Sequence, residues 1–233
     1  MGCDMKVNSY EELFKLNDSA KVEFVDNCVY IDDFYENVND IYDYTLNRPL
    51  YPLWKYDPEI DTRNGIDYND CRFLDNIPFW TRTMEMDVER IKNICRRHWW
   101  KGEYTFDRCF EVNCFQTKTI FDSTLQHYPH VDGGFEDPDD YTTLNMIVYL
   151  DKKEDGGTAV YDGCWIENIE QHNLLYPTIK EYDLNKVIEH KYNRCVIFPG
   201  NRLHGAYIND YNNYCGENWR YAQVRFFHPD VSK

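Results

Sequence analysis

The stretch TTLNMIVYLDKKEDGGTAVYDG, residues 142–163, decides the fold of this chain. Two runs with strand composition, residues 142–150 and 157–162, flank a charged turn that ends in Gly156 and Gly157. β-Branched and aromatic residues favour strands, and a short link ending in glycine is typical of an antiparallel hairpin. The stretch therefore predicts two neighbouring antiparallel strands.

Further strand-like runs surround this hairpin in the second half of the chain. They occupy residues 110–117, 126–131, 187–190, 195–198, 204–209 and 219–227. Short strands with hairpin-like links favour a two-sheet jelly roll over a parallel α/β sheet, which needs a helix between strand pairs. We therefore expect a mainly β fold with flanking α elements: a double-stranded β-helix, or cupin-like barrel, supported by N-terminal helices.

The first 102 residues have mainly helical and turn-rich patterns, unlike the strand-like patterns of the rest. Candidate capping boxes at Ser9 and Asp33 predict two helices, a third helix is expected over residues 87–99, and a strand is expected to end at residues 29–31. Residues 47–78 are rich in Pro, Asp, Asn and Gly. This composition favours an irregular segment of the kind that covers a functional site.

We expect one structural domain with two parts. Residues 1–102 form a helical and loop extension packed on the barrel, and residues 103–233 form the double-stranded β-helix core. Residues 164–186 interrupt this core as an insertion of mixed composition. Because binding residues concentrate on loops carried by a rigid scaffold, we expect the extension and the insertion to cover the barrel mouth and determine the substrate.

The charge of the chain argues against nucleic acid as a partner. Lys and Arg total 25 against 41 Asp and Glu, a formal net charge of −16 at pH 7. Such a field repels phosphate backbones and anionic membrane surfaces. We therefore expect neither a nucleic-acid partner nor a membrane partner.

The chain also lacks the sequence marks of export. No window has the roughly 18–20 uninterrupted apolar residues of a membrane span, and the start, MGCDMKVNSYEE, lacks the apolar stretch of a secretory signal. The nine cysteines contain no C-x-x-C pair, which argues against a zinc knuckle or a disulfide framework. We expect a cytoplasmic protein with reduced thiols.

The sharpest candidate for chemistry is the triplet His130-Val131-Asp132 within LQHYPHVDGG. Residues i and i+2 of a strand project from one face, so His130 and Asp132 are expected to face one metal ion inside the barrel. His204, in CVIFPGNRLHGAY, is the natural third ligand on the penultimate strand. Two imidazoles and one carboxylate form the facial triad of non-haem Fe(II) oxygenases, although this ligand set does not exclude Mn, Co, Ni or Zn.

The sequence resembles the Fe(II)/2-oxoglutarate-dependent dioxygenases, and among them the prolyl 4-hydroxylase-like branch. The resemblance spans residues 110–227 and rests on four pieces in order: the His-x-Asp triplet, the hairpin of residues 142–163, the segment VIFPGNRLHGA and the strand WRYAQVRFF. It implies Fe(II), the cosubstrate 2-oxoglutarate and O₂, with ascorbate as a possible reductant. It also implies that His130, Asp132 and His204 are both the metal ligands and the catalytic residues.

The resemblance further implies a basic residue early on the last strand. This residue neutralises the distal carboxylate of 2-oxoglutarate, since an unpaired anion inside an apolar barrel costs several kcal/mol. Arg220 matches this position best and Arg225 competes with it; their odd separation turns them to opposite faces of a regular strand. Asn145 and Tyr149 are further candidates for the cosubstrate pocket.

One feature departs from the family pattern. Arg220 follows His204 at a longer spacing than is usual in the prolyl 4-hydroxylase-like branch. We therefore expect residues 208–218, INDYNNYCGEN, to form an enlarged hairpin loop. This departure bears on the Arg220 assignment and leaves the metal ligands untouched.

The implied activity is hydroxylation of an unactivated C–H bond, with release of succinate and CO₂. Its substrate would be an amino acid, a peptide or protein side chain, or a small metabolite, and the acidic loop FEDPDDY leans towards a cationic or zwitterionic one. Halogenases of this superfamily lack the carboxylate ligand, so Asp132 favours hydroxylation, desaturation or cyclisation. The alternatives are a non-catalytic cupin-like metal-binding or structural module, and a metal-dependent isomerase or hydrolase on the same barrel.

Overall fold

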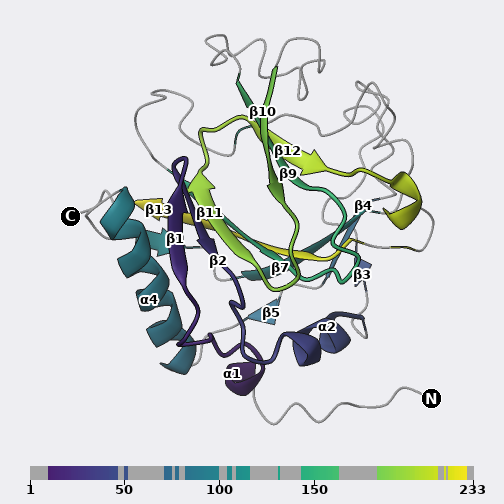
Figure 1. Cartoon of the computed structure of the whole chain (residues 1–233). Coiled ribbons are helices and arrows are strands. Elements are labelled where there is room, and N and C mark those ends of the chain that lie inside the picture. Colours follow the sequence, from purple (N-terminus) through teal and green to yellow (C-terminus); the bar gives the residue numbers. More distant parts are fainter. Residues whose placement is uncertain are drawn as a thin grey trace, which may run out of the picture.

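The computed structural model describes residues 10–46, 50–51, 71–74, 77–78, 82–99, 104–106, 109–115, 131, 143–162, 183–214, 218 and 220–229. Two antiparallel sheets face each other in this part of the chain (Figure 1). The predicted jelly roll is therefore confirmed. None of the helices in the described ranges is both long enough and apolar enough to cross a membrane.

The larger sheet, here the major sheet, has the strand order β1-β2-β11-β8-β13-β7-β4-β3, with β5 paired to β7 and β6 paired to β13. Its strands are β1 (Val22–Val25), β2 (Cys28–Ile31), β3 (Leu50–Tyr51), β4 (Cys71–Leu74), β5 (Ile77–Pro78), β6 (Tyr104–Phe106), β7 (Cys109–Phe115), β8 (Leu144–Tyr149), β11 (Cys195–Pro199) and β13 (Ala222–Pro229). The smaller, minor sheet has the order β10-β9-β12. Its strands are β9 (Gly157–Asp162), β10 (Asp183–Glu189) and β12 (His204–Tyr207).

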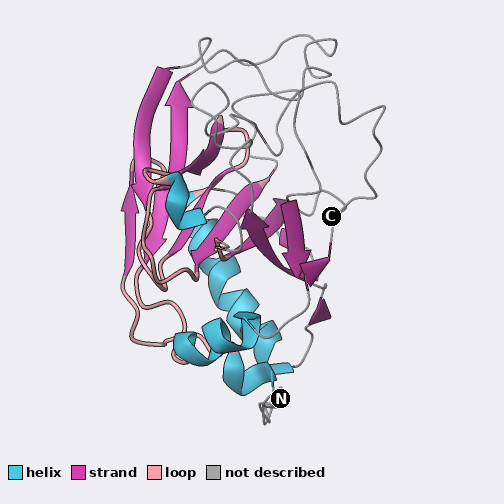
Figure 2. Ribbon diagram, turned by 90° about the vertical axis from the view of Figure 1, so that its right-hand side faces the viewer, coloured by secondary structure: helices cyan, strands magenta, loops and turns pink. Residues whose placement is uncertain are grey.

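Helices cover the outer face of the major sheet. They are α1 (Tyr10–Leu13), α2 (Val38–Leu46) and α4 (Arg82–His98), and they gather at the lower side of the molecule in Figure 2. Ile91, Ile94 and Cys95 of α4 share one apolar cluster with strand residues that include Met146 and Ile197. Burial of this shared apolar surface holds the helical extension against the barrel.

Strand alternation separates this outer face from the interior of the roll. On β8, Met146 belongs to the cluster with the helices, whereas Tyr149 belongs to an interior cluster with Val160 of β9 and Phe198 of β11. Successive side chains of a strand point to opposite faces, so each strand of the major sheet contributes to both layers. The interior layer is the one that carries the candidate site.

The N-terminal extension contributes strands as well as helices. Strand β2, expected from the sequence, pairs with β11 of the core, and β1, which the sequence did not indicate, pairs with β2. The two-residue link of this hairpin, Asp26 and Asn27, has φ values of 49° and 58°. Asp and Asn tolerate such values, as a tight hairpin turn requires. The extension and the core therefore share one sheet.

Several boundaries differ from the sequence prediction. Strand β10 begins at Asp183, inside the segment expected as an insertion. Its first three residues, 183–185, are all exposed, so no alternation of buried and exposed positions marks the start of the strand. The last strand runs from Ala222 to Pro229 and not over 219–227. Most of the predicted loop 47–78, the predicted strand 126–131 except Val131, and residues 163–182 lie outside the described residues.

The predicted turn before β9 requires both of its glycines. Gly156 has φ +73°, and a Cβ there would lie 1.9 Å from the Tyr207 carbonyl oxygen. Gly157 has φ +147°, and its Cβ would lie 1.9 Å from the Ile188 carbonyl oxygen. Only glycine allows β9 to approach both β10 and β12 this closely.

We expect Gly157→Ala to destabilise the fold strongly, since it combines a forbidden backbone conformation with a backbone clash. A loss of about 3 kcal/mol or more is expected from these two effects. Gly200→Ala is the comparison, with a smaller loss expected, because its φ is not positive and its Cβ would meet Asn145 and Thr143 at 3.1–3.2 Å, a tight contact and not an overlap. Urea unfolding of the two variants measures this; equal stability would contradict the packing described for Gly157.

Candidate functional site

His204 is the first residue of β12 and its side chain is buried. It pairs with Val160 of β9, an interior residue of the roll. The ring Nδ1 lies 2.8 Å from the Arg202 carbonyl oxygen. Because a carbonyl only accepts, Nδ1 carries the proton, and Nε2 of the neutral ring presents its lone pair. This is the tautomer in which a histidine binds a metal through Nε2.

Asn145 lies beside this nitrogen. Its Nδ2 is 3.3 Å from His204 Nε2, and the Asn145 side chain is 1% exposed. Strand β8 places Asn145 opposite Phe198 of β11, and the Phe198 ring meets the His204 ring edge-on at 5.0 Å. The structure thus brings two sequence-predicted site residues together at one end of the interior.

Arg220 lies in the interior of the protein just before β13. The residue is 5% exposed, and its Nη2 donates to the Gly157 carbonyl oxygen at 2.7 Å. Among the described residues no carboxylate lies within ion-pair distance of this guanidinium, and its buried Nε has no hydrogen-bond partner. A buried cation without an anion is costly, so this position suits an anionic ligand.

Tyr149 lies next to Arg220. The guanidinium carbon of Arg220 is 5.8 Å from the centre of the Tyr149 ring, a cation–π distance. The Tyr149 hydroxyl shares a 2.7 Å hydrogen bond with Thr158 Oγ1. Complete burial raises the pKa of Tyr149, so its hydroxyl remains protonated and can donate to an anion.

His190 supports Tyr149 and was not distinguished by the sequence from an ordinary structural histidine. Its ring stacks on the Tyr149 ring at 4.7 Å, and its Nε2 lies 2.9 Å from the Asp151 carbonyl oxygen. Burial, followed by the positive charge of Arg220, lowers the pKa of His190 to about 3. The only sequence signal for its inward placement is the alternation from Ile188, two positions earlier and also buried.

Arg220 and His204 contact the same strand of the minor sheet, β9, at two different positions along it. Val160 of β9 pairs with His204, and Gly157 of β9 accepts the Arg220 hydrogen bond. Three residues of a strand span about 10 Å. A cation site at His204 and an anion site at Arg220 would therefore be separated by a length that suits an extended five-carbon diacid.

Arg225 lies on the other face of the major sheet. It pairs with Met146, whose side chain packs in the cluster with the helices. The neighbouring Gln223 amide, oriented to donate to Tyr35, places its oxygen 3.2 Å from Arg225 Nη2 and Nε. The guanidinium of Arg225 is thus satisfied within the helix layer and does not face the interior of the roll.

His130 and Asp132 lie outside the described residues, but Val131 between them is described. Val131 packs against the cluster of Ala159, Tyr161 and Leu203. This cluster lies on the face of the minor sheet opposite to Val160. Within the described ranges no group of three His, Cys, Asp or Glu side chains is placed to hold a metal.

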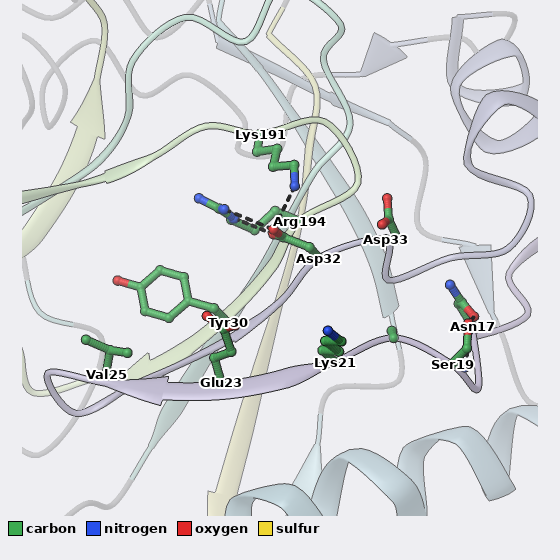
Figure 3. A pocket seen from close by; sticks show the side chains of 11 residues that line it. Asn17, Ser19, Lys21, Glu23, Val25, Tyr30, Asp32, Asp33, Lys191 and Arg194 are labelled. Carbon is green, nitrogen blue, oxygen red and sulfur yellow. Dashed lines mark hydrogen bonds and ion pairs between the residues drawn. The ribbon is translucent and has the colours of Figure 1, made fainter.

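A groove of about 570 Å³ lies elsewhere, along the inner side of β1 and β2 (Figure 3). It is lined mainly by polar residues that include Lys21, Glu23 and Tyr30. Its Asp32 carboxylate pairs with Lys191 at 2.7 Å and with Arg194 at 2.6 Å. The whole lining carries three cations and three carboxylates, so the groove lacks the uncompensated cation that marks the Arg220 position.

The chain was compared with known proteins by sequence and by structure. No protein-family model matches it, and no curated protein matches it significantly by sequence. HygX from Streptomyces hygroscopicus, solved with nickel and 2-oxoglutarate bound, matches with a TM-score of 0.52 at 11% identity, over 88% of this chain and 84% of HygX. The non-haem α-ketoglutarate-dependent epimerase SnoN of nogalamycin biosynthesis matches with a TM-score of 0.50 at 14% identity, over 88% and 78% of the two chains. The chain therefore shares its jelly-roll fold with HygX and SnoN.

The lowered pKa of His190 predicts a specific acid sensitivity. The pKa of histidine in an unfolded chain is near 6.5. Below that pH the unfolded chain therefore binds a proton at His190 that the folded chain does not bind. The stabilisation by neutral His190 is complete above pH ~6.5 and is lost as the pH falls towards about 3. Between pH 7 and 5 this loss is about 2 kcal/mol.

The measurement is the free energy of unfolding in urea at pH 7 and at pH 5, for the wild type and for His190→Gln. The variant should lose less stability than the wild type over this interval. Parallel losses in the two proteins would show that His190 is not held neutral by its surroundings.

Proposed function

We propose that this protein is an Fe(II)- and 2-oxoglutarate-dependent oxygenase that hydroxylates an unactivated C–H bond. The observation that carries the proposal is the buried Arg220, which lacks an anionic partner among the described residues. It lies in the same interior layer as His204, whose neutral ring presents the Nε2 lone pair. The Arg220 guanidinium could bind the distal carboxylate of a keto acid, and the His204 imidazole could bind the metal ion that holds its other end.

The described residues fit a metal on His204. Val131, which separates His130 from Asp132 in the sequence, packs against a cluster of the minor sheet, the sheet that also carries His204. We propose these three side chains as a facial triad for Fe(II), which leaves coordination positions for the keto acid and O₂. The neutral Nε2 of His204 is already in the form that binds a metal.

The cosubstrate would lie along the interior of the roll. Arg220 would bind the distal carboxylate through charge-assisted hydrogen bonds, with the Tyr149 hydroxyl as a second donor. The Asn145 amide, beside His204 Nε2, would donate to the carboxylate at the metal end. Arg225 is set aside for this role because its side chain lies among the helices on the opposite face of the major sheet.

O₂ would be the oxidant: at bound Fe(II) one of its oxygen atoms would enter succinate as 2-oxoglutarate loses CO₂, and the other would enter the substrate as a hydroxyl group. The chain itself would hold the metal, orient the diacid and keep water from the interior. The carboxylate of Asp132 favours hydroxylation, desaturation or cyclisation over halogenation. An amino acid, a peptide or protein side chain, or a small metabolite remains the proposed substrate, with ascorbate as a possible reductant.

The alternative of a non-catalytic cupin-like module is less consistent with the interior. Such a module has no need for a buried cation that lacks a carboxylate partner. A metal-dependent isomerase or hydrolase on this barrel would leave Arg220 equally unexplained. We also propose a cytoplasmic location, in keeping with the free, buried thiols of Cys28, Cys95 and Cys195.

Removing a proposed metal ligand should abolish turnover. We expect His204→Ala and Asp132→Ala each to lower iron- and 2-oxoglutarate-dependent succinate release at least about 100-fold, because each deletes a coordinating atom. The assay measures succinate in the presence of candidate substrates, and mass spectrometry of those substrates detects the addition of one oxygen atom. Full turnover in both variants would overturn the ligand assignment.

Substitutions of Arg220 and of Arg225 should have very different effects on the KM for 2-oxoglutarate. Arg220→Gln should raise the KM for 2-oxoglutarate about 10- to 100-fold, since it removes a charge-assisted pair worth about 1.5–3 kcal/mol. Arg225→Lys is the matched control on the other face and should leave this KM within about twofold. An equal effect of both changes, or an effect of Arg225→Lys alone, would reverse the assignment.

A further inference from the structure

We propose that Asp155 is a positioning residue, which fixes the enlarged loop of residues 208–214 and thereby holds Arg220 in place for the cosubstrate. The inference rests on the proposed function, because it assigns Arg220 the role of binding the distal carboxylate. The need for such a residue is plain from the sequence. Arg220 follows His204 by 16 positions, and a loop of this length is not confined to one position by its ends alone.

The Asp155 carboxylate is the main polar anchor of this loop. Oδ1 accepts the backbone N–H of Asn209 at 3.2 Å, and Oδ2 accepts the backbone N–H of Asp210 at 3.0 Å. Oδ2 also accepts the side-chain Nδ2 of Asn213 at 3.2 Å. Asp155 itself is only 8% exposed, and the three bonds are partly buried.

The loop is buried at both ends of the segment that Asp155 binds. Ile208 is 2% exposed, and Tyr214, at the end of the short 3₁₀ helix η4 (Tyr211–Tyr214), is fully buried. The ammonium of Lys153 lies 4.9 Å from the centre of the Tyr214 ring. Residues 208–214, the first part of the loop that leads to Arg220, are therefore packed against the turn that precedes β9.

The same turn receives Arg220. Gly157, two residues after Asp155, accepts the Arg220 hydrogen bond through its carbonyl oxygen. Between them, the carbonyl oxygen of Gly156 accepts the backbone N–H of His190, whose ring supports Tyr149. Three consecutive residues thus bind three parts of the site: Asp155 binds the loop, Gly156 binds the backbone of His190, and Gly157 binds Arg220. A displacement of Asp155 would therefore also displace the arginine.

The chemistry of the anchor explains why it is a carboxylate. All three groups that contact Asp155 are donors, and only an ionised carboxylate offers acceptors at both of its terminal atoms. Asp155→Asn has nearly the same shape but replaces one acceptor by an NH₂ donor. At least one buried donor then faces another donor, so the loop must move to restore its hydrogen bonds.

The test is the affinity of 2-oxoglutarate for the Fe(II)-loaded protein, measured by calorimetric titration without oxygen. Asp155→Asn should weaken this affinity about tenfold, and Asn213→Ala, which removes one of the three donors, about threefold. The affinity for Fe(II) and the kcat at saturating 2-oxoglutarate should change less than about twofold. A residue that only stabilised the fold would lower the melting temperature without this selective loss of cosubstrate affinity.

Glu154→Gln is the matched control. It removes one negative charge from the neighbouring residue, whose carboxylate binds the backbone N–H of Tyr192 and not the loop. It should leave cosubstrate affinity unchanged, and an effect as large as that of Asp155→Asn would overturn the proposal by attributing it to charge alone.

Three further outcomes would overturn the positioning role of Asp155. Wild-type affinity in folded Asp155→Asn would overturn the positioning role while leaving the proposed function intact. If Asp155→Asn does not fold, unchanged affinity in Asn213→Ala overturns it instead. A wild-type protein that binds no 2-oxoglutarate when loaded with Fe(II) would overturn the proposed function and this inference together.

Discussion

The burial of an arginine inside the roll is the constraint on which the rest of the site depends. A guanidinium keeps its charge at any physiological pH, so the interior must supply an anion or bear a large cost. The described interior supplies the Gly157 carbonyl and the face of the Tyr149 ring, which stabilise a cation but do not neutralise it. We propose that an anionic ligand completes this arrangement.

The turn of residues 155–157 connects this constraint to the sheets. Its glycines let the three strands of the minor sheet pack closely together, and its carbonyls and carboxylate bind the segments around Arg220. His204, the proposed metal ligand, lies on the same minor sheet, on the strand paired with β9. The same backbone contacts thus build the fold and the site. Strand β9, which both His204 and Arg220 contact, also sets the distance between the proposed metal and the proposed carboxylate.

Much of this architecture could be predicted from the sequence because it rests on local patterns. Strands β8 and β9 were both predicted from their strand-like composition and the glycine turn between them, and the predicted jelly roll is confirmed. Their direct pairing as a hairpin was wrong, because β8 pairs with β11 and β13 in the major sheet, whereas β9 pairs with β10 and β12 in the minor sheet. The strand Val22–Val25 escaped prediction, since all four of its residues are exposed and follow no apolar alternation. His190 and Asp155 escaped as well, because their roles arise from contacts between distant segments. The roles assigned to His130, Asp132 and Arg220 stay predictions.

The most direct measurement of the central claim compares two keto acids on the Fe(II)-loaded protein without oxygen. 2-Oxoglutarate and 2-oxopentanoate share the metal-binding end and differ in the distal carboxylate that Arg220 is proposed to bind. We expect 2-oxoglutarate to bind at least about 100-fold more tightly, as loss of a buried ionic partner predicts. Equal affinities would show that the buried arginine does not serve the cosubstrate.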